Sequence, residues 1–320
     1  MKMKYYLVLI LISIINISCD NNFSPKAPYD ARYSLNCIIR GDTSFQVATA
    51  FKSYDVSGMN PYENTKDSFV DDAFIRIWRG NDEVFVFSDS TKQRTDTSRY
   101  NTDIKYYNIN NFKPNEGDSL EIEALMPNGR RLRSFTKIPR RVLRISEDSD
   151  VEVTRDLKDY LRTNWKVRNN DQAYLPKLYI AYLVNENGVK IRKSKIVPWK
   201  KLQTDSGIKY LYPVPSKDSF IGYEMDIIRE AMEDISKNDT LKSKYEIISL
   251  MLAISTFDEN LSAYYSTVGY DDNSFAIGLD EGDYSNIENG FGIFGSFFTQ
   301  TFNIKISKGV VISFGYVLFE

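Results

Sequence analysis

Apolar and polar residues alternate in short runs from residue 32 to residue 138. The clearest runs are rich in aromatic and β-branched side chains, are separated by polar turns, and cover residues 33–39, 45–51, 73–78 and 83–87. Such runs are typical of strands. Short strands at this spacing in about a hundred residues predict an immunoglobulin-like or fibronectin-like sandwich. The polar stretches 54–72 and 89–103 are then expected to be surface loops.

One of these runs predicts more than a half-buried strand. Residues 73–78 carry small or aliphatic side chains at the odd positions and large ones at the even positions, namely Phe74, Arg76 and Trp78. Successive side chains of a strand lie on opposite faces of the sheet. The pattern therefore buries one face and partly covers the other with aromatic and basic side chains.

Two hairpins are predicted from Asn-Gly pairs. In residues 119–138, two alternating runs flank Asn128-Gly129, a pair that tolerates the positive φ angles of a tight type I′ turn. A second pair, Asn187-Gly188, separates the runs 178–184 and 189–197 in the same way. The second half of the chain is therefore expected to be rich in strands as well.

Helical signals are few. Thr256 and Glu259 have the spacing of a capping box, and Leu261, Tyr264, Tyr265 and Val268 follow at i, i+3, i+4 and i+7. Residues 223–235 alternate at first and then adopt helical spacing, which predicts a strand that runs into a short helix. The last residues, 310–320, alternate again and predict a final strand.

The first nineteen residues follow a different pattern. Lys2 and Lys4 precede an uncharged apolar run at 7–17, and Ser18 is followed by Cys19. This is the order of a secretory signal, and the run is shorter than the roughly 20 residues of a membrane span. Residues 1–19 resemble a bacterial lipoprotein signal peptide, cleaved before Cys19, which then carries palmitate. An ordinary signal with an incidental cysteine is the alternative, because Asn16 stands where lipoprotein signals usually carry Leu.

The domain organisation follows from these patterns. Residues 20–31 are polar and contain two prolines, which predicts a flexible tether. The β-sandwich domain covers residues 32–139 and ends at Pro139. Residues 140–320 form a second β-rich domain with one or two short helices, and 320 residues suffice for two domains. The expected fold class is mainly β.

The amino-acid composition limits the kinds of catalytic and metal-binding sites that the chain can form. Hydrophobic residues make up 42% and charged residues 26% of the chain, as in ordinary globular proteins, and a formal net charge of -2 gives no global field that recruits nucleic acid. Histidine is absent, which removes Ser-His-Asp and Cys-His nucleophiles and imidazole metal sites. Carboxylate pairs, Lys, Tyr or a Ser-Lys dyad remain. With lipid on Cys19, Cys37 has no partner, and its place in an alternating run predicts a small buried strand residue.

Gly290, Gly292 and Gly295 form a G-x-G-x-x-G pattern, but the following run lacks the helical periodicity that a dinucleotide site requires. These glycines are predicted to mark bulges or close backbone contacts. Asn286-Ile287 and the segment 292–295, preceded by the helical segment 259–268, resemble the end of the DUF4249 family of Bacteroidota lipoproteins. Asn289 departs from this pattern, because it stands where the family usually has a glycine. The resemblance implies an outer-membrane-associated lipoprotein, often found beside TonB-dependent receptors, and it implies no activity.

Charged and aromatic clusters have ordinary explanations that we expect to hold. The acids between 271 and 283 fit no EF-hand spacing and are expected to be solvated loop carboxylates, with a calcium site as the alternative. Two basic clusters are expected to be solvated faces first and sites for an anionic partner second; their members are Arg130, Arg131, Arg133, Lys137, Arg140, Arg141, Lys190, Arg192, Lys193 and Lys195. Trp78, Trp165 and Trp199 are expected in the core or in cross-strand pairs rather than against a ligand.

The expected function is that of a non-enzymatic cell-envelope lipoprotein, held at the outer membrane by lipid on Cys19 and facing the periplasm or the exterior. It would be a binding or accessory component of a TonB-dependent transporter, with no catalytic residues, cofactor, metal or nucleic acid and an unspecified ligand. An envelope carboxylate-dependent hydrolase acting on glycans and a structural or assembly lipoprotein are the alternatives.

Overall fold

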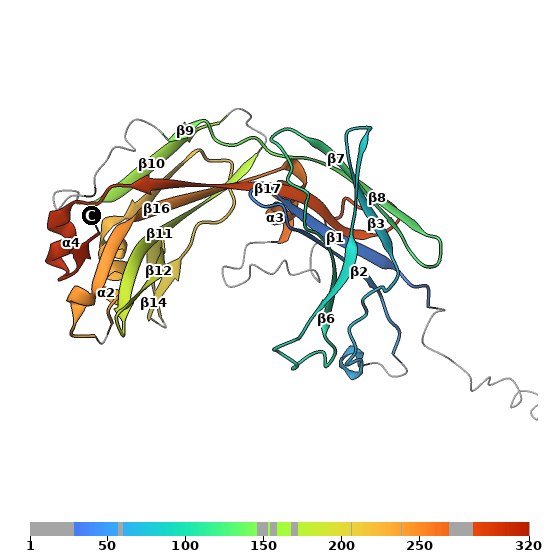
Figure 1. The fold of residues 1–320 in the computed structure, drawn as a ribbon, viewed down its shortest axis with the longest axis horizontal. Coiled ribbons are helices and arrows are strands. Elements are labelled where there is room, and N and C mark those ends of the chain that lie inside the picture. The colour runs from blue at the N-terminus through green and yellow to red at the C-terminus, as the bar shows by residue number, and fades with distance from the viewer. Residues whose placement is uncertain are drawn as a thin grey trace, which may run out of the picture.

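The computed structural model describes residues 29–56, 60–145, 153, 159–167, 172–205, 207–237, 239–268 and 284–319. The chain is mainly β, as predicted, and forms two lobes that are joined by long strands (Figure 1). Each lobe has its own cluster of buried apolar side chains. A third, smaller cluster lies where the lobes meet, beneath helix α3 (Glu259–Val268).

The N-terminal lobe is a sandwich of two sheets. One sheet contains β1 (Tyr33–Arg40), β2 (Gln46–Lys52), β6 (Ile104–Ile109) and β5 (Ser88–Lys92), and the other has the order β4-β3-β7-β8. The strands of the second sheet are β4 (Glu83–Val86), β3 (Phe74–Arg79), β7 (Ser119–Leu125) and β8 (Arg131–Lys137). Alternate residues of both sheets meet in one buried core. The strands predicted in residues 33–87 are thus confirmed, whereas the expected loop 89–103 begins inside β5.

The C-terminal lobe is built on the other end of the same large sheet, in the order β12-β11-β16-β17. Its strands are β11 (Ala173–Glu186), β12 (Val189–Val197), β16 (Tyr245–Phe257) and β17 (Phe291–Ile304). A three-stranded sheet covers part of this core with β15 (Phe220–Glu224), β10 (Tyr160–Lys166) and β9 (Arg144–Ile145). Helices α2 (Met225–Asp234) and α4 (Lys308–Ser313) add buried residues to it. The remaining elements are the hairpin β13 (Lys200–Thr204) and β14 (Gly207–Leu211), strand β18 (Val317–Leu318), and the short helices η1 (Pro61–Glu63) and η3 (Lys242–Lys244).

Strand β17 belongs to both lobes. Its first residues pair in parallel with β1, from Phe291 opposite Ser34 to Phe297 opposite Arg40. From Phe297 onward it pairs with β16 in the antiparallel sense. The long red strand in Figure 1 shows this continuity across the molecule. One strand therefore fixes the two halves of the chain to each other.

The glycines before and within β17 permit this close approach, as predicted. Gly292 has φ +108°, and a Cβ built there would lie 2.2 Å from the carbonyl oxygen of Leu35. A Cβ on Gly290 would lie 2.8 Å from the carbonyl oxygen of Tyr33. Only glycine leaves room for the neighbouring backbone at these distances.

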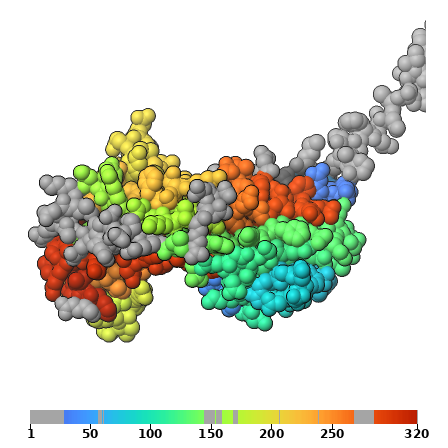
Figure 2. All heavy atoms as spheres, turned by 90° about the horizontal axis from the view of Figure 1, so that it is seen from above, coloured from blue at the N-terminus to red at the C-terminus, as the bar shows by residue number. Residues whose placement is uncertain are grey.

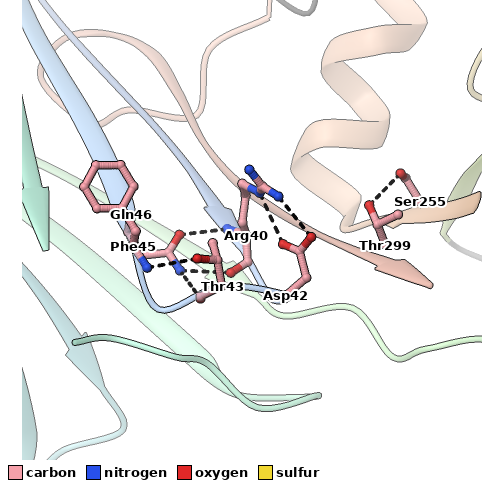
Figure 3. A network of polar contacts seen from close by, with 7 residues as sticks. All are labelled: Arg40, Asp42, Thr43, Phe45, Gln46, Ser255 and Thr299. Carbon is pink, nitrogen blue, oxygen red and sulfur yellow. Dashed lines mark hydrogen bonds and ion pairs between the residues drawn. The ribbon is translucent and has the colours of Figure 1, made fainter. Parts of the chain in front are cut away.

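A polar network closes the β1–β2 turn at the junction of the lobes (Figure 3). The Gln46 amide donates to the carbonyl oxygens of Arg40 and Thr43, both at 2.9 Å, and its oxygen accepts from the Arg40 N–H at 2.9 Å. The N–H of Gly41 donates to the carbonyl oxygen of Phe297 at 2.8 Å. The turn is thereby bonded to β17 at the residue where that strand changes partners.

Both predicted hairpins are present, but their turns differ. Asn187 and Gly188 both have positive φ, at 54° and 85°, as a two-residue type I′ turn requires. In the other hairpin, Gly129 has φ +82° while Asn128 is not among the residues with positive φ. The Gly129 N–H donates to the carbonyl oxygen of Met126, and the Met126 N–H donates to that of Arg130. The type I′ prediction was therefore wrong there, because three residues lie between Met126 and Arg130 and only the glycine among them is left-handed.

Two further predictions are corrected. Thr256 is not the helix cap, because it lies within β16; the cap is Asp258, whose carboxylate accepts from the Leu261 N–H at 2.8 Å. The expected final strand is instead α4, capped by Ser307, followed by the two-residue β18. The adjacent residues Val310 and Val311 are both buried, which a helical turn allows and a half-buried strand does not. The predicted strand-to-helix transition in residues 223–235 is confirmed by β15 and α2.

Candidate functional site

The outward face of the β4-β3-β7-β8 sheet is the candidate site, and we call it the outer sheet face. Its side chains come from alternate residues whose neighbours are buried in the sandwich core. Strand pairing arranges them in three rows: Phe74, Leu125 and Arg131; Val86, Arg76, Glu123 and Arg133; and Val84, Trp78, Glu121 and Phe135. In Figure 2 the cyan and green atoms of this sheet form the lower side of the N-terminal lobe, directly beneath the red and orange atoms of β17 and α3.

Large apolar side chains remain exposed at the ends of this face. Phe74 is 47% and Phe135 is 55% exposed, and Val84, Val86 and Leu125 are exposed as well. A single exposed apolar residue needs no explanation, but several that adjoin one another on a sheet are unusual for a surface that meets only water. The face therefore has the apolar content of a protein-binding surface.

Paired charges occupy the centre of the outer sheet face. The Arg76 guanidinium donates twice to Glu123 Oε1, at 2.7 and 3.1 Å, and Arg133 is bonded to Glu121. Glu123 is only 7% exposed, because the basic side chains cover it. The Arg76 guanidinium also lies 5.0 Å from the ring centre of Trp78 and 5.8 Å from that of Phe74.

This pairing makes the face suitable for contact with another protein. Arginine and aromatic residues are the side chains enriched in the centres of protein interfaces. Arg76 and Arg133 already have carboxylate partners, so a partner that covers them need not supply its own charges. Hydrogen bonds among neighbouring strands also hold the face rigid before binding, which lowers the entropic cost of association.

A second polar feature lies buried where the lobes meet. The Asp258 carboxylate accepts hydrogen bonds from the Leu261 N–H and from the Thr136 hydroxyl of β8. The Asp258 N–H donates to the carbonyl oxygen of Ser296 in β17 at 3.0 Å. Burial raises the pKa of Asp258 to about 6, although these hydrogen bonds act in the opposite direction. Asp258 thus bonds to strands of both parts of the chain, which is a structural role.

Asn286 supports the same junction. Its amide bonds both the N–H and the carbonyl oxygen of Phe294, and its own carbonyl oxygen accepts from the Ser134 hydroxyl. Asn260 of α3 donates to the carbonyl oxygens of Phe135 and Phe294. The segment on which the family resemblance depends is therefore a packing and hydrogen-bonding motif.

The structure tests the prediction for Cys37, but not those for Cys19 and the acidic loop. Cys37 is buried in β1, as predicted, and burial raises the pKa of its thiol. Cys19 and the acids between 271 and 283 lie outside the described residues. Within the part of the chain that the structure describes, no group of three or more His, Cys, Asp or Glu side chains could hold a metal ion. In that same part, no helix has the length and apolar character needed to cross a membrane.

The basic clusters lie on solvated surfaces, as expected. Lys190, Lys193 and Lys195 of β12 pair with Glu246, Glu186 and Asp234. In the other cluster, Arg131, Arg133 and Arg141 pair with Glu123, Glu121 and Glu116. Trp165 is buried, and Trp199 packs against the core, but Trp78 belongs to the outer sheet face. The sequence signal for that face was the large even-numbered side chains of residues 73–78, which gave no indication of the matching residues on β7 and β8.

The fold and the outer sheet face define a two-lobed, mainly β protein with a surface suited to binding. The chain belongs to the family described as a domain of unknown function, DUF4249, whose model matches residues 20–302. No curated protein matches the chain. The family match covers most of both lobes, so the shared strand β17 lies almost wholly inside it.

Proposed function

We propose that the protein is a non-enzymatic envelope lipoprotein that binds a partner protein through its outer sheet face. The proposed anchor is lipid on Cys19 at the outer membrane of a Bacteroidota cell, and the proposed partner is a TonB-dependent transporter. The signal-like leader and the family resemblance support the location. The exposed aromatic and aliphatic side chains around paired charges support the binding role, and they carry the proposal.

The sequence distance to the anchor suits this arrangement. Tyr29, the first described residue, is the tenth residue after Cys19, and extended chain spans at most about 3.6 Å per residue. Tyr29, where the N-terminal lobe begins, would therefore stay within about 36 Å of the lipidated Cys19. Tyr29 is held to the lobe by a hydrogen bond between its hydroxyl and that of Ser53 at 2.9 Å. A partner embedded in the same membrane is then within reach of the outer sheet face.

The test is affinity capture of the full-length protein from detergent-solubilised envelopes, followed by mass spectrometry. The double variant Phe74→Ser/Phe135→Ser removes two exposed rings from the face, and their backbone hydrogen bonds in β3 and β8 remain available. Val189→Ser/Ile208→Ser removes two exposed apolar side chains from the C-terminal lobe and is the matched control. Each ring that the partner buries should contribute about 2 kcal/mol of binding free energy, as is typical of interface hot spots. Loss of both rings would therefore weaken binding more than a hundredfold.

We expect the wild type and the control to recover the same transporter, and the face variant to lose it while its melting temperature stays that of the wild type. If the face variant recovers as much transporter as the wild type, the outer sheet face is not the surface that binds it. Recovery of other proteins without any transporter would favour the structural or assembly role instead. The hydrolase alternative requires two acids in one cleft; the hollow on β10 and β15 and the one beside α2 have no acid in their linings.

A further inference from the structure

A shallow hollow of about 510 Å³ lies on the outward face of the β10–β15 pair, in the C-terminal lobe. Tyr160, Arg162 and Asn164 of β10 line it, with Phe220 and Gly222 of β15. Strand pairing places Arg162 opposite Gly222 and Asn164 opposite Phe220. Two aromatic rings, a guanidinium and an amide are thus gathered around a glycine. The volume is within the range of small-molecule sites.

The backbone beneath the hollow is fixed by the core. The alternate residues Leu161, Trp165, Ile221 and Tyr223 are buried in the C-terminal lobe. The Tyr223 hydroxyl donates to the carbonyl oxygen of Pro176 of β11 at 3.2 Å, which bonds this small sheet to the large one. The side chains around the hollow are therefore carried by rigid strands rather than by loops, as a preorganised site requires.

The fold itself does not need a glycine at position 222. Its φ is not in the left-handed region, and the pairing of β10 with β15 runs without a bulge from Tyr160 to Asn164. A Cβ at this position would lie 3.6 Å from Tyr160 Cδ1 and 3.9 Å from Arg162 Cγ, which are ordinary contacts. Glycine weakens a strand interior, and it often marks a bulge, a bend or a place where a ligand or another backbone comes close. Here the missing side chain forms the floor of the hollow.

The side chains around this floor indicate the class of ligand. Phe220 is 66% and Tyr160 is 43% exposed, so both offer an apolar surface to a ring. Arg162, and Lys166 farther along the same face of β10, make no ion pair with any residue that the structure describes. The Arg162 guanidinium lies 5.9 Å from the ring centre of Tyr160. A guanidinium without a carboxylate partner can bind a carboxylate with two parallel hydrogen bonds, and the Asn164 amide both donates and accepts. The complementary ligand has a ring with an apolar face, hydroxyl groups and a carboxylate.

We propose that this hollow is a binding subsite for a carboxylated sugar ring, the uronate unit of an acidic oligosaccharide. The C–H face of the ring packs on Tyr160 and Phe220 above Gly222. Arg162 binds the carboxylate, and Asn164 bonds the ring hydroxyls. The subsite is in the opposite lobe from the outer sheet face and does not depend on the partner proposed for that face.

Calorimetric titration of the detergent-solubilised full-length protein tests the proposal with two probes. Digalacturonate carries the carboxylates, and digalactose has the same rings without them. We expect the wild type to bind digalacturonate at least about tenfold more tightly than digalactose, the factor that one charge-assisted bidentate contact supplies. Arg162→Gln should abolish this difference, whereas the matched control Arg192→Gln, on exposed β12, should retain it.

Gly222→Ala separates binding from folding. The added methyl group should leave the melting temperature unchanged or higher and should weaken both probes at least about tenfold, because it fills the floor of the hollow. Wild-type affinity in Gly222→Ala or in Arg162→Gln would overturn the proposal. So would displacement of digalacturonate by an equal concentration of acetate, which would show attraction of charge alone, or the absence of heat with both probes at millimolar concentration.

Discussion

Replacing Asp258 by asparagine should make the protein more stable at neutral pH. The carboxyl is buried where the lobes meet, and burial raises its pKa from 3.8 to about 6. Between these two pH values the folded protein holds a proton that the unfolded chain has lost. The stabilisation from this group is therefore fully present below pH 3.8 and is lost as the pH rises through 6.

The size of the effect follows from the shift. A rise of the pKa from 3.8 to about 6 corresponds to about 3 kcal/mol of lost stability at pH 7, since each pH unit is worth about 1.4 kcal/mol. Asparagine does not ionise, and it caps a helix as well as aspartate does. Its amide oxygen can accept from the Leu261 N–H and its amide nitrogen can donate to the Thr136 hydroxyl. The substitution thus removes the buried charge and keeps the hydrogen bonds to Leu261 and Thr136.

Urea unfolding of both proteins between pH 3.5 and 8 gives the measurement. The free energy of unfolding of Asp258→Asn minus that of the wild type should be near zero at the acid end and should rise to about 3 kcal/mol at pH 7. Taking the difference removes the titration of every other carboxyl group that the two proteins share. Parallel pH profiles would refute the reasoning. Asp258→Ala, which removes the cap as well, should be less stable than Asp258→Asn at every pH by about 1 kcal/mol.

Two further predictions concern the strand shared by the lobes and the membrane anchor. Gly292→Ala should prevent folding, because φ is +108° and the added Cβ would lie 2.2 Å from the Leu35 carbonyl oxygen. The control Gly80→Ala, at φ +61° with nothing within 4 Å, should lose only about 1 kcal/mol of stability. Circular dichroism and urea unfolding measure both variants, and a folded Gly292→Ala protein would contradict the close approach. Cys19→Ala should move the protein from the membrane pellet to the supernatant on fractionation and abolish palmitate labelling, and a mutant that stays in the pellet would show another attachment.

Local signals predicted the elements whose neighbours are close in sequence. The hairpin at Asn187-Gly188 and the strand that runs into helix α2 depend on turn residues and periodicity, and both are present. The prediction failed at the end of the chain, where alternation at 312–318 indicated a strand. There Ser307 accepts from the Val310 N–H and starts α4, and Gly315 with φ +82° follows its end. A short alternating run is compatible with either a strand or a helix, and here the Ser307 cap favours the helix.

The outer sheet face was only partly visible in the sequence. The even-numbered side chains of residues 73–78 indicated a strand with one buried face and one partly covered face, which β3 confirms. The rows that complete the face depend on which strands are neighbours and in what register, for example Trp78 opposite Glu121 and Glu121 opposite Phe135. The hollow on β10 and β15 had no signal at all, because about sixty residues separate Tyr160 from Gly222.

Strand β17 shows why much of this fold could not be predicted from the sequence: its contacts join residues that are far apart along the chain. The Ile293 N–H donates to the Asn36 side-chain oxygen across 257 positions of the chain. Phe294 and Phe298 of the same strand are buried in the N-terminal core, while Ile304 is buried in the C-terminal one. Without these residues, β1 would have an unpaired edge and the sandwich would expose apolar side chains. The N-terminal core is therefore completed only after nearly the whole chain is made, so the two lobes should unfold together rather than as independent domains.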